Sequence, residues 1–399
     1  MTGGVTLARR IALFSAILIG VDFLDELASG IPGISSPDIQ NEFQVSYGMA
    51  AGWLIAAFGL LAVVLEPPLF LLADRYPRRW FVCGGLAVLA VSCFIAASAS
   101  SYWILFAALL LFGPASGCGV GLAQATLVDA NPGDRERMLL RWTLSGSLGD
   151  LSAPLLLIGL AGLGLGWRTA FALSGVVATG LAVSLWRQPF PNLQDEDATH
   201  APPRMRELLG DALRNKRLRP WIAGVILCDL LDELVIGFGA LFLRDDLGLG
   251  LQARGLILAS FTAGGAIGLA VSERLLQRFR PLPLLAASCA ASSILYMLWL
   301  TASGPVVSGL LFFAVGLATS SHYPLASAQA YRALPDRSGS VNAVLSLAFA
   351  LQLPIPLLLG WVADTFGLLP CLTMLIAQPV GLLAITLSQI ATKGRQPKG

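Results

Sequence analysis

The sequence predicts an all-α membrane protein with twelve transmembrane helices, arranged as two pseudo-symmetric six-helix bundles. Only 13% of its 399 residues are charged, about half the roughly 25% that is usual in soluble proteins, and its mean hydropathy is +0.74. Apolar segments of about 20 residues, long enough to cross the hydrocarbon of a bilayer, recur along the chain. Sequence motifs of the first half also return in the second half.

Two sets of six apolar segments follow one another, with short polar loops inside each set. We expect each segment to form one membrane-spanning helix. The predicted spans are 11–33, 48–72, 80–99, 103–130, 138–162 and 167–187 in the first set, and 219–242, 252–275, 281–301, 305–332, 338–363 and 367–391 in the second.

The least apolar stretch of the chain, residues 188–218, separates the two sets of segments. We interpret it as a cytoplasmic linker. The predicted domains are therefore an N-terminal bundle at 1–187 and a C-terminal bundle at 219–399, joined by that linker.

The basic residues predict how the chain is oriented, because Lys and Arg favour the cytoplasmic loops of membrane proteins. With both termini in the cytoplasm, all of the 26 basic residues except Arg168, Arg244 and Arg254 fall on the cytoplasmic side. One helix more or fewer in the predicted topology would move all later loops to the other side of the membrane and remove this asymmetry. We therefore predict an integral protein of a bacterial inner (plasma) membrane, with both termini cytoplasmic and the lipid bilayer as its main partner.

The two halves share an internal repeat. The pattern D-x-L-D-E-L-x-x-G begins at Asp22 in the first half and at Asp229 in the second. A second pair of matching triplets, A-Q-A, is centred on Gln124 and Gln329. Two parallel repeats of six helices, related by an axis along the membrane normal, are the architecture of a large class of secondary transporters.

The loop after the second predicted helix carries a recognisable signature. Its sequence FLLADRYPRR, residues 70–79, resembles the G-x-L-A-D-R-x-G-R-R/K signature of the major facilitator superfamily, although Phe70 and Pro77 replace the two glycines. With its twelve predicted helices, the chain resembles this family over nearly its whole length. The resemblance implies that the loop latches the two halves at the cytoplasmic face, through the gating residues Asp74, Arg75, Arg78 and Arg79.

The fifth predicted helix carries a second resemblance. Its pattern Gly149-x-x-x-Ala153-Pro154 is similar to the core of the antiporter motif of drug/proton exchangers in the same family. This similarity implies export. A kinked helix at a packing interface explains the same residues equally well.

Acidic residues inside the first and seventh spans are the main candidates for function. Residues at i, i+3 and i+4 share one face of a helix, so each trio is expected to form one patch near the middle of the membrane. Neighbouring carboxylates at about 6 Å repel by about 3 kcal/mol at an effective dielectric near 20, so an empty trio cannot be fully ionised. We predict that protons and a cationic substrate compete for Asp22, Asp25 and Glu26 in the first half, and for Asp229, Asp232 and Glu233 in the second.

Charged residues at this depth avoid lipid and face a bundle interior or a wet cavity. In the fold that the resemblance implies, the first and seventh helices both line the central cavity. A structural role in helix packing is the alternative for some of these acids. Further candidates for the cavity, with packing or hydrogen-bonding roles as their alternatives, are Glu66, Gln124, Asp150, His322 and Gln329.

These features favour a secondary active transporter, monomeric, that exports a cationic or zwitterionic small molecule in exchange for protons. A divalent metal carrier is the second hypothesis, since carboxylates suit hard cations, and a sodium-coupled symporter is a third. A lipid flippase or a non-transporting membrane receptor represents a different class of function.

Several other functions find no support in the sequence. The six cysteines stand singly in apolar runs and there are only two histidines, so disulfide frameworks and zinc sites are not expected. No nucleophile–base constellation or phosphate-binding loop occurs. We therefore expect neither an enzyme nor a nucleic-acid-binding protein. We expect no cofactor other than a proton or another coupling cation, and the sequence does not specify which metal, if any, is bound.

Overall fold

The computed structural model describes residues 2–73, 76–131, 135–188, 190, 215, 217–228, 230–333 and 350–394. Within these ranges the chain forms helices and no strands, which confirms the predicted all-α class. The chain separates into two compact units. The first unit consists of Met1–Val45 and Trp53–Asp195, and the second of Ser46–Gly52 and Glu196–Gly399.

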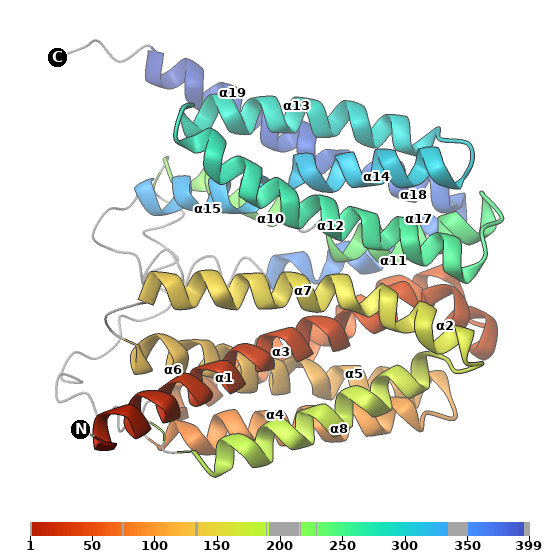
Figure 1. Cartoon of the computed structure of the whole chain (residues 1–399). Helices are drawn as coiled ribbons and strands as arrows, with labels where there is room; N and C mark the ends of the chain where they lie inside the picture. Colours follow the sequence, from red (N-terminus) through yellow and green to blue (C-terminus); the bar gives the residue numbers. More distant parts are fainter. Residues whose placement is uncertain are drawn as a thin grey trace. The chain divides into compact units, whose positions relative to one another are not determined.

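The described residues of the first unit form eight α-helices and one π-helical turn, η2 (Figure 1). Their bounds are α1 Thr2–Ile34, α2 Ser36–Phe43, α3 Leu54–Ala73, α4 Arg78–Ala97, α5 Tyr102–Ser116, η2 Gly117–Gly121, α6 Leu122–Ala130, α7 Arg135–Gly162 and α8 Trp167–Trp186.

The second unit contains nine α-helices within the described residues, and most of the π-helical turn η1, Gly48–Trp53, also belongs to it. The helices are α10 Arg219–Leu227, α11 Glu233–Asp245, α12 Leu251–Leu276, α13 Pro281–Leu300, α14 Pro305–Thr319, α15 His322–Ala333, α17 Pro354–Phe366, α18 Leu368–Met374 and α19 Ala377–Gly394.

Nine helical segments of the described chain are long and apolar enough to cross a membrane. Each of them overlaps one of the predicted spans. They are Gly48–Phe70, Arg78–Ala97, Tyr102–Ala130, Arg141–Gly162, Trp167–Trp186, Leu251–Leu276, Pro281–Leu300, Pro305–Ala333 and Leu368–Thr392.

The other three predicted spans correspond to less regular segments. The helix α1 covers the span 11–33 but carries three acidic residues within its apolar sequence. The span 338–363 is represented by the shorter apolar helix Ala350–Phe366, and its earlier residues lie outside the described part. The arrangement is consistent with twelve spans.

The prediction of one continuous helix at 219–242 is wrong. The helix α10 ends at Leu227 and α11 begins only at Glu233. The broken region contains the acidic motif, and the backbone N–H of Leu231 in this region donates to the side-chain Oε1 of Gln378 at 2.6 Å. A side-chain partner therefore replaces a hydrogen bond that a continuous helix would have made.

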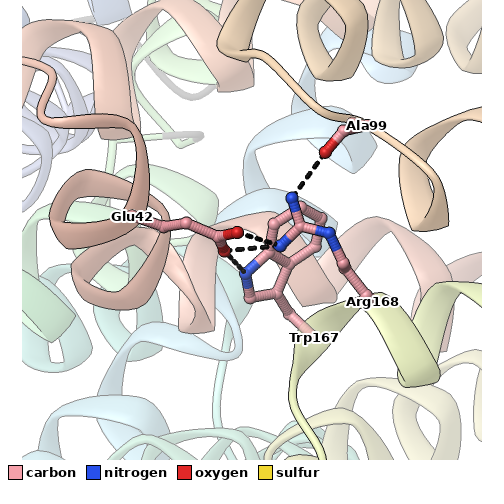
Figure 2. A network of polar contacts seen from close by, with 4 residues as sticks. All are labelled: Glu42, Ala99, Trp167 and Arg168. Atoms are coloured by element: carbon pink, nitrogen blue, oxygen red, sulfur yellow. Dashed lines mark hydrogen bonds and ion pairs between the residues drawn. The ribbon is translucent and has the colours of Figure 1, made fainter.

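The short helix α2 is fixed to the first unit by a polar cluster. Figure 2 shows that Glu42 of α2 accepts hydrogen bonds from Trp167 and Arg168 at the start of α8, while Arg168 also donates to the carbonyl of Ala99. The Arg168 guanidinium also lies over the rings of Phe43 and Trp167. These contacts account for Arg168, one of the three basic residues predicted away from the cytoplasm.

Candidate functional site

Two acidic residues of α1 lie against α7. Asp22 is only 5% exposed. A Cβ atom at Gly146 of α7 would lie 2.7 Å from Asp22 Oδ2 and 3.2 Å from Glu26 Cγ, and one at Gly149 would lie 3.0 Å from Glu26 Cβ. The two glycines therefore let α1 and α7 approach closely enough to enclose the carboxyl group of Asp22 and to pack against the aliphatic part of Glu26.

The third acid of the trio contacts a different helix. Ser116, the last residue of α5, donates from its hydroxyl to Asp25 Oδ2 at 2.8 Å. The other carboxyl oxygen, Oδ1, is buried and has no hydrogen-bond partner among the described residues. The trio is therefore contiguous along α1, but it is divided between two neighbouring helices.

A fourth carboxyl group reaches the same turn from α3. The side chain of Glu66 packs on Gly117, where the Cγ atom would be 2.9 Å from an added Cβ. Gly117 begins the π-helical turn η2, directly after Ser116. Turns of this kind are rare and frequently occur at functional sites. Residues 116 and 117 thus contact carboxyl groups from α1 and from α3.

Within the described residues, no basic side chain forms a salt bridge with Asp22, Asp25 or Glu66. The salt bridges of that part of the chain include Arg78–Asp129, Arg168–Glu42 and Arg244–Asp245, which involve other carboxyl groups. An isolated carboxylate inside a membrane protein is costly. Such a group is stable when it carries a proton or when a cation approaches it.

The acidic motif of the second unit is arranged differently. Asp232 and Glu233 are exposed, and α11 begins at Glu233, while Asp229 lies outside the described residues. The expectation that this trio lies on one face of a single helix is wrong, because the helix is interrupted between Leu227 and Glu233. Only α1 has the helical spacing that the sequence predicted for both motifs.

A buried polar chain connects this interruption to three other helices. Gln378 of α19 accepts from the Leu231 N–H and lies 3.3 Å from His322 Nδ1, while His322 Nε2 lies 3.4 Å from the Ser292 hydroxyl. The Gln378 nitrogen can only donate, so Nδ1 must accept and the proton of a neutral ring must sit on Nε2. Ser292 in turn donates to the carbonyl of Cys289.

His322 was predicted as a possible cavity residue. The structure places it in the interior of the second unit, where it is 1% exposed and hydrogen bonded through both ring nitrogens. Among the described residues, its polar neighbours are uncharged amide, hydroxyl and backbone groups. The contacts describe an interior imidazole with satisfied hydrogen bonds.

The remaining cavity candidates are distributed over both units. Gln124 and Asp150 are half-buried on α6 and α7. Gln329 of α15 is 4% exposed, and its side-chain nitrogen has no hydrogen-bond partner in the described part of the chain. Its free donor is consistent with a role in substrate binding, which stays a prediction.

Half of the predicted gating loop can be placed. Arg78 forms an ion pair with Asp129 at 2.5 Å, and Arg79 Nη2 donates to the carbonyl of Gln188 at 2.8 Å. Both contacts are internal to the first unit. Asp74 and Arg75 lie outside the described residues, so the latch between the two halves stays a prediction.

Sequence reasoning missed several residues of the site. Ser116, Gly146 and Gln378 became visible only through their contacts. The available signals were the small residues Ser116 and Gly146 within predicted spans, and the amide Gln378 within an apolar segment. Among the described residues, no three His, Cys, Asp or Glu side chains are grouped to hold a metal ion.

The sequence profile of the Major Facilitator Superfamily matches residues 18–355. The chain belongs to this superfamily. The match spans most of both units, and it confirms the family that the signature at residues 70–79 indicated. Within the Major Facilitator Superfamily, the chain is therefore an integral membrane transporter.

Two curated proteins illustrate the range of sequences to which this chain is similar. The chain is 29% identical to a chloramphenicol resistance protein of Streptomyces lividans over 294 residues, which cover 70% of this chain and 72% of that protein. It is 28% identical to the 3-(3-hydroxy-phenyl)propionate transporter of Escherichia coli (strain K12) over 273 residues, 66% of each protein.

A solved structure of the superfamily shows the same fold. The nucleoside transporter NupG matches with a TM-score of 0.76 and 15% sequence identity, over 94% of this chain and 99% of that structure. At this identity the likeness establishes the fold of the Major Facilitator Superfamily and carries no information on substrate.

Proposed function

We propose that this Major Facilitator Superfamily transporter is a proton-coupled antiporter that exports a cationic or zwitterionic small molecule. The observation that carries the proposal is the state of Asp25. One of its carboxyl oxygens accepts a hydrogen bond from the Ser116 hydroxyl, and the other is buried without a partner among the described residues. Asp25 also forms no salt bridge with a described Lys or Arg. This carboxyl group is suited to bind and release a proton during each transport cycle.

The neighbouring carboxyl groups support a cationic rather than an anionic substrate. Asp22 and Glu26 lie on the same helix as Asp25, and Glu66 of α3 packs on Gly117, next to the Ser116 that holds Asp25. Ionising all four groups together would build up unfavourable like charge. A positive substrate would relieve this repulsion, and so would a proton. Competition between the two for the same group of oxygens couples export of the substrate to uptake of protons.

Transport would follow from movement of one six-helix half relative to the other, the mechanism of alternating access. In the inward state Asp25 would release its proton and the substrate would bind. After the change in access, protonation would displace the substrate. The name of the chloramphenicol resistance protein among the relatives favours export.

The second candidate is a divalent metal carrier. This candidate uses the two carboxylate motifs: the acidic residues of α1 could supply oxygen ligands in the first unit, and Asp232 and Glu233 could supply them in the second. The described residues contain no ready cluster of three ligands, so this candidate ranks below the antiporter.

The proposal can be tested in proteoliposomes that enclose a pH-sensitive dye. An outward proton gradient is imposed, and tetraphenylphosphonium, chloramphenicol or Mn²⁺ is added in separate experiments. We expect tetraphenylphosphonium to cause a change in internal pH with wild-type protein, and at least a tenfold slower change with Asp25→Asn. The matched control is Asp246→Asn, which alters an exposed carboxyl group outside the spans and should behave as wild type.

The other probes separate the alternatives. A proton signal with Mn²⁺ alone would favour the metal carrier, and one with chloramphenicol alone would show that the substrate need not be charged. Full activity of Asp25→Asn would remove Asp25 from the coupling mechanism.

A further inference from the structure

A groove lies on the surface of the first unit, between the first turns of α4 and the last turns of α8, which run side by side (Figure 1). Its volume is about 450 Å³, within the range of roughly 300–1,000 Å³ that is typical of small-molecule sites. Small side chains create the groove. Its lining includes Gly84 and Ala87 of α4 and Ala182 of α8, and a Cβ atom added at Gly84 would meet nothing within 4 Å.

The surface around the groove has the character of a lipid-facing surface. Both α4 and α8 qualify as membrane spans, and their outward residues Val91, Phe94 and Val176 are exposed apolar side chains. Two tryptophans, Trp80 and Trp186, line the groove and remain 62% and 45% exposed. Exposed tryptophan in a membrane protein is typical of the level of the lipid headgroups.

The two tryptophans lie together at the end of the groove. Their ring centroids are 4.8 Å apart with an interplanar angle of 80°. This edge-to-face arrangement gives the groove an apolar and rigid wall. The groove therefore combines a notch of small residues with aromatic rings at the depth where an acyl chain meets its headgroup.

Among the described residues, Arg187 is the one basic side chain without a partner at this end of the groove. Arg187 lines it and is exposed, with no hydrogen bond or ion pair to any described residue. The nearby basic residues are engaged, since Arg78 pairs with Asp129 and Arg79 donates to the Gln188 carbonyl. The charge distribution predicts that this end of the helices is cytoplasmic, and the cytoplasmic leaflet is the one rich in anionic lipid.

From these observations we infer that the groove between α4 and α8 is a binding site for an anionic phospholipid. One acyl chain lies over Gly84 and Ala87 and against the rings of Trp80 and Trp186. The headgroup phosphate binds the guanidinium of Arg187. The site is independent of the proposed antiport, because it uses none of the acidic residues of α1.

Quenching of tryptophan fluorescence by brominated lipid tests this site. The protein is reconstituted in phosphatidylcholine vesicles that contain increasing fractions of either brominated phosphatidylglycerol or brominated phosphatidylcholine. The fluorescence of the double variant Trp80→Phe/Trp186→Phe is subtracted from that of the wild type, and the difference is the signal of Trp80 and Trp186. We expect this signal to be half-quenched at a mole fraction at least threefold lower for the anionic lipid. Equal mole fractions for the two lipids would overturn the proposal, because they would indicate ordinary contact with bulk lipid.

Three variants then assign the parts of the site. Arg187→Gln should bring the two half-quenching fractions together, and Gly84→Leu should reduce quenching by both lipids because the added side chain fills the notch. Gly180→Leu is the matched control on α8: a Cβ atom there also meets nothing within 4 Å, but the residue does not line the groove, so quenching should be unchanged. A preference for the anionic lipid that survives in Arg187→Gln would exclude Arg187 as the headgroup site.

Discussion

At the scale of single residues, the acids of α1 differ because their neighbours differ. Asp22 is enclosed against Gly146 of α7, whereas Asp25 is held by one hydroxyl from Ser116 and keeps one oxygen without a partner in the described part. The sequence could predict that these acids lie on one helix three and four residues apart. It could not predict which of them points to which neighbour, because that depends on how the helices pack.

Loss of the Gln378 side chain should weaken the second unit. In the variant Gln378→Leu, the Leu231 N–H of the interrupted helix loses its acceptor, and a buried unsatisfied group costs about 1–3 kcal/mol. We expect the free energy of unfolding to fall by about this amount, measured as reduced thermal stability in detergent. Gln277→Leu, at an exposed position after α12, should cause little change.

A double-mutant cycle would show whether Gln378 and His322 act together. Because Gln378 donates to His322 Nδ1, the losses in His322→Leu and Gln378→Leu should not add. Strictly additive losses would mean that the two side chains contribute independently, and the hydrogen-bonded chain would then have no energetic meaning.

Two neighbouring aspartates at the end of α11 should respond to acid in opposite ways. Partial burial would raise the pKa of Asp245, but hydrogen bonds from Arg244 and Tyr47 outweigh it and hold that pKa below its usual value. Burial, followed by the charge of Asp245, raises the pKa of Asp246. A lowered pKa stabilises the folded protein above the unfolded value of about 3.9, and this stabilisation is lost as the pH falls through the lower folded value.

We therefore expect Asp245→Asn to lower thermal stability at pH 6, and expect the difference from wild type to shrink as the pH falls below about 4. For Asp246→Asn the sign is reversed, because a carboxyl group with a raised pKa destabilises the folded state once it is ionised. That variant should be as stable as wild type, or more stable, at pH 6. Thermal melting of both variants between about pH 4 and pH 6 tests these expectations. The same dependence of melting temperature on pH in both variants would contradict the opposite pKa shifts of Asp245 and Asp246.

At the scale of elements, the two copies of the acidic motif show what a repeated sequence does not determine. The first copy lies within the continuous helix α1, and the second coincides with the break between α10 and α11. Six of the nine motif positions carry the same residue in both copies. The second copy also has a tertiary partner at the break, the amide of Gln378 that accepts from the Leu231 N–H. Hydropathy predicts the membrane spans because it depends only on the composition of each segment. A helix break that is stabilised by a side chain distant in sequence cannot be predicted from the residues around the break.

Close packing of α1 on α7 depends on glycine. In the variant Gly146→Ala, the new Cβ would lie 2.7 Å from Asp22 Oδ2, so the carboxyl group or the helix must move. We expect a loss of about 1–3 kcal/mol, the usual cost of overpacking, together with slower proton-coupled transport. Both are measurable on purified protein, by thermal melting and in proteoliposomes.

Gly159→Ala provides the control on the same helix. A Cβ atom there would have no neighbour within 4 Å, and alanine favours a helix over glycine by up to about 1 kcal/mol. This variant should be as stable as wild type or slightly more stable. Equal effects of the two substitutions would mean that packing against Asp22 is unimportant.

At the scale of the whole molecule, the sequence predicted the family, the spans and the two sets of helices, since each follows from composition or from a repeated motif. It did not predict that residues Ser46–Gly52 would belong to the second unit while their neighbours on both sides belong to the first. The reason is a contact far along the chain. Asp364 accepts hydrogen bonds from the Gly48 N–H at 2.9 Å and from the Ser46 hydroxyl at 2.7 Å.

This segment should limit how freely the protein changes conformation, because alternating access requires the two halves to move. In Asp364→Asn the charge is removed and only one acceptor oxygen remains. Hydrogen bonds to charged groups contribute about 1.5–3 kcal/mol, so we expect hydrogen exchange at Gly48 to accelerate by roughly tenfold or more, with a change in transport rate of at least twofold. The control Asp246→Asn, near the end of α11, should alter neither. Gly48 also packs closely on Gly360, where an added Cβ would lie 2.7 Å from Gly48 Cα. Unchanged hydrogen exchange at Gly48 in Asp364→Asn would show that this packing holds the segment without the carboxylate.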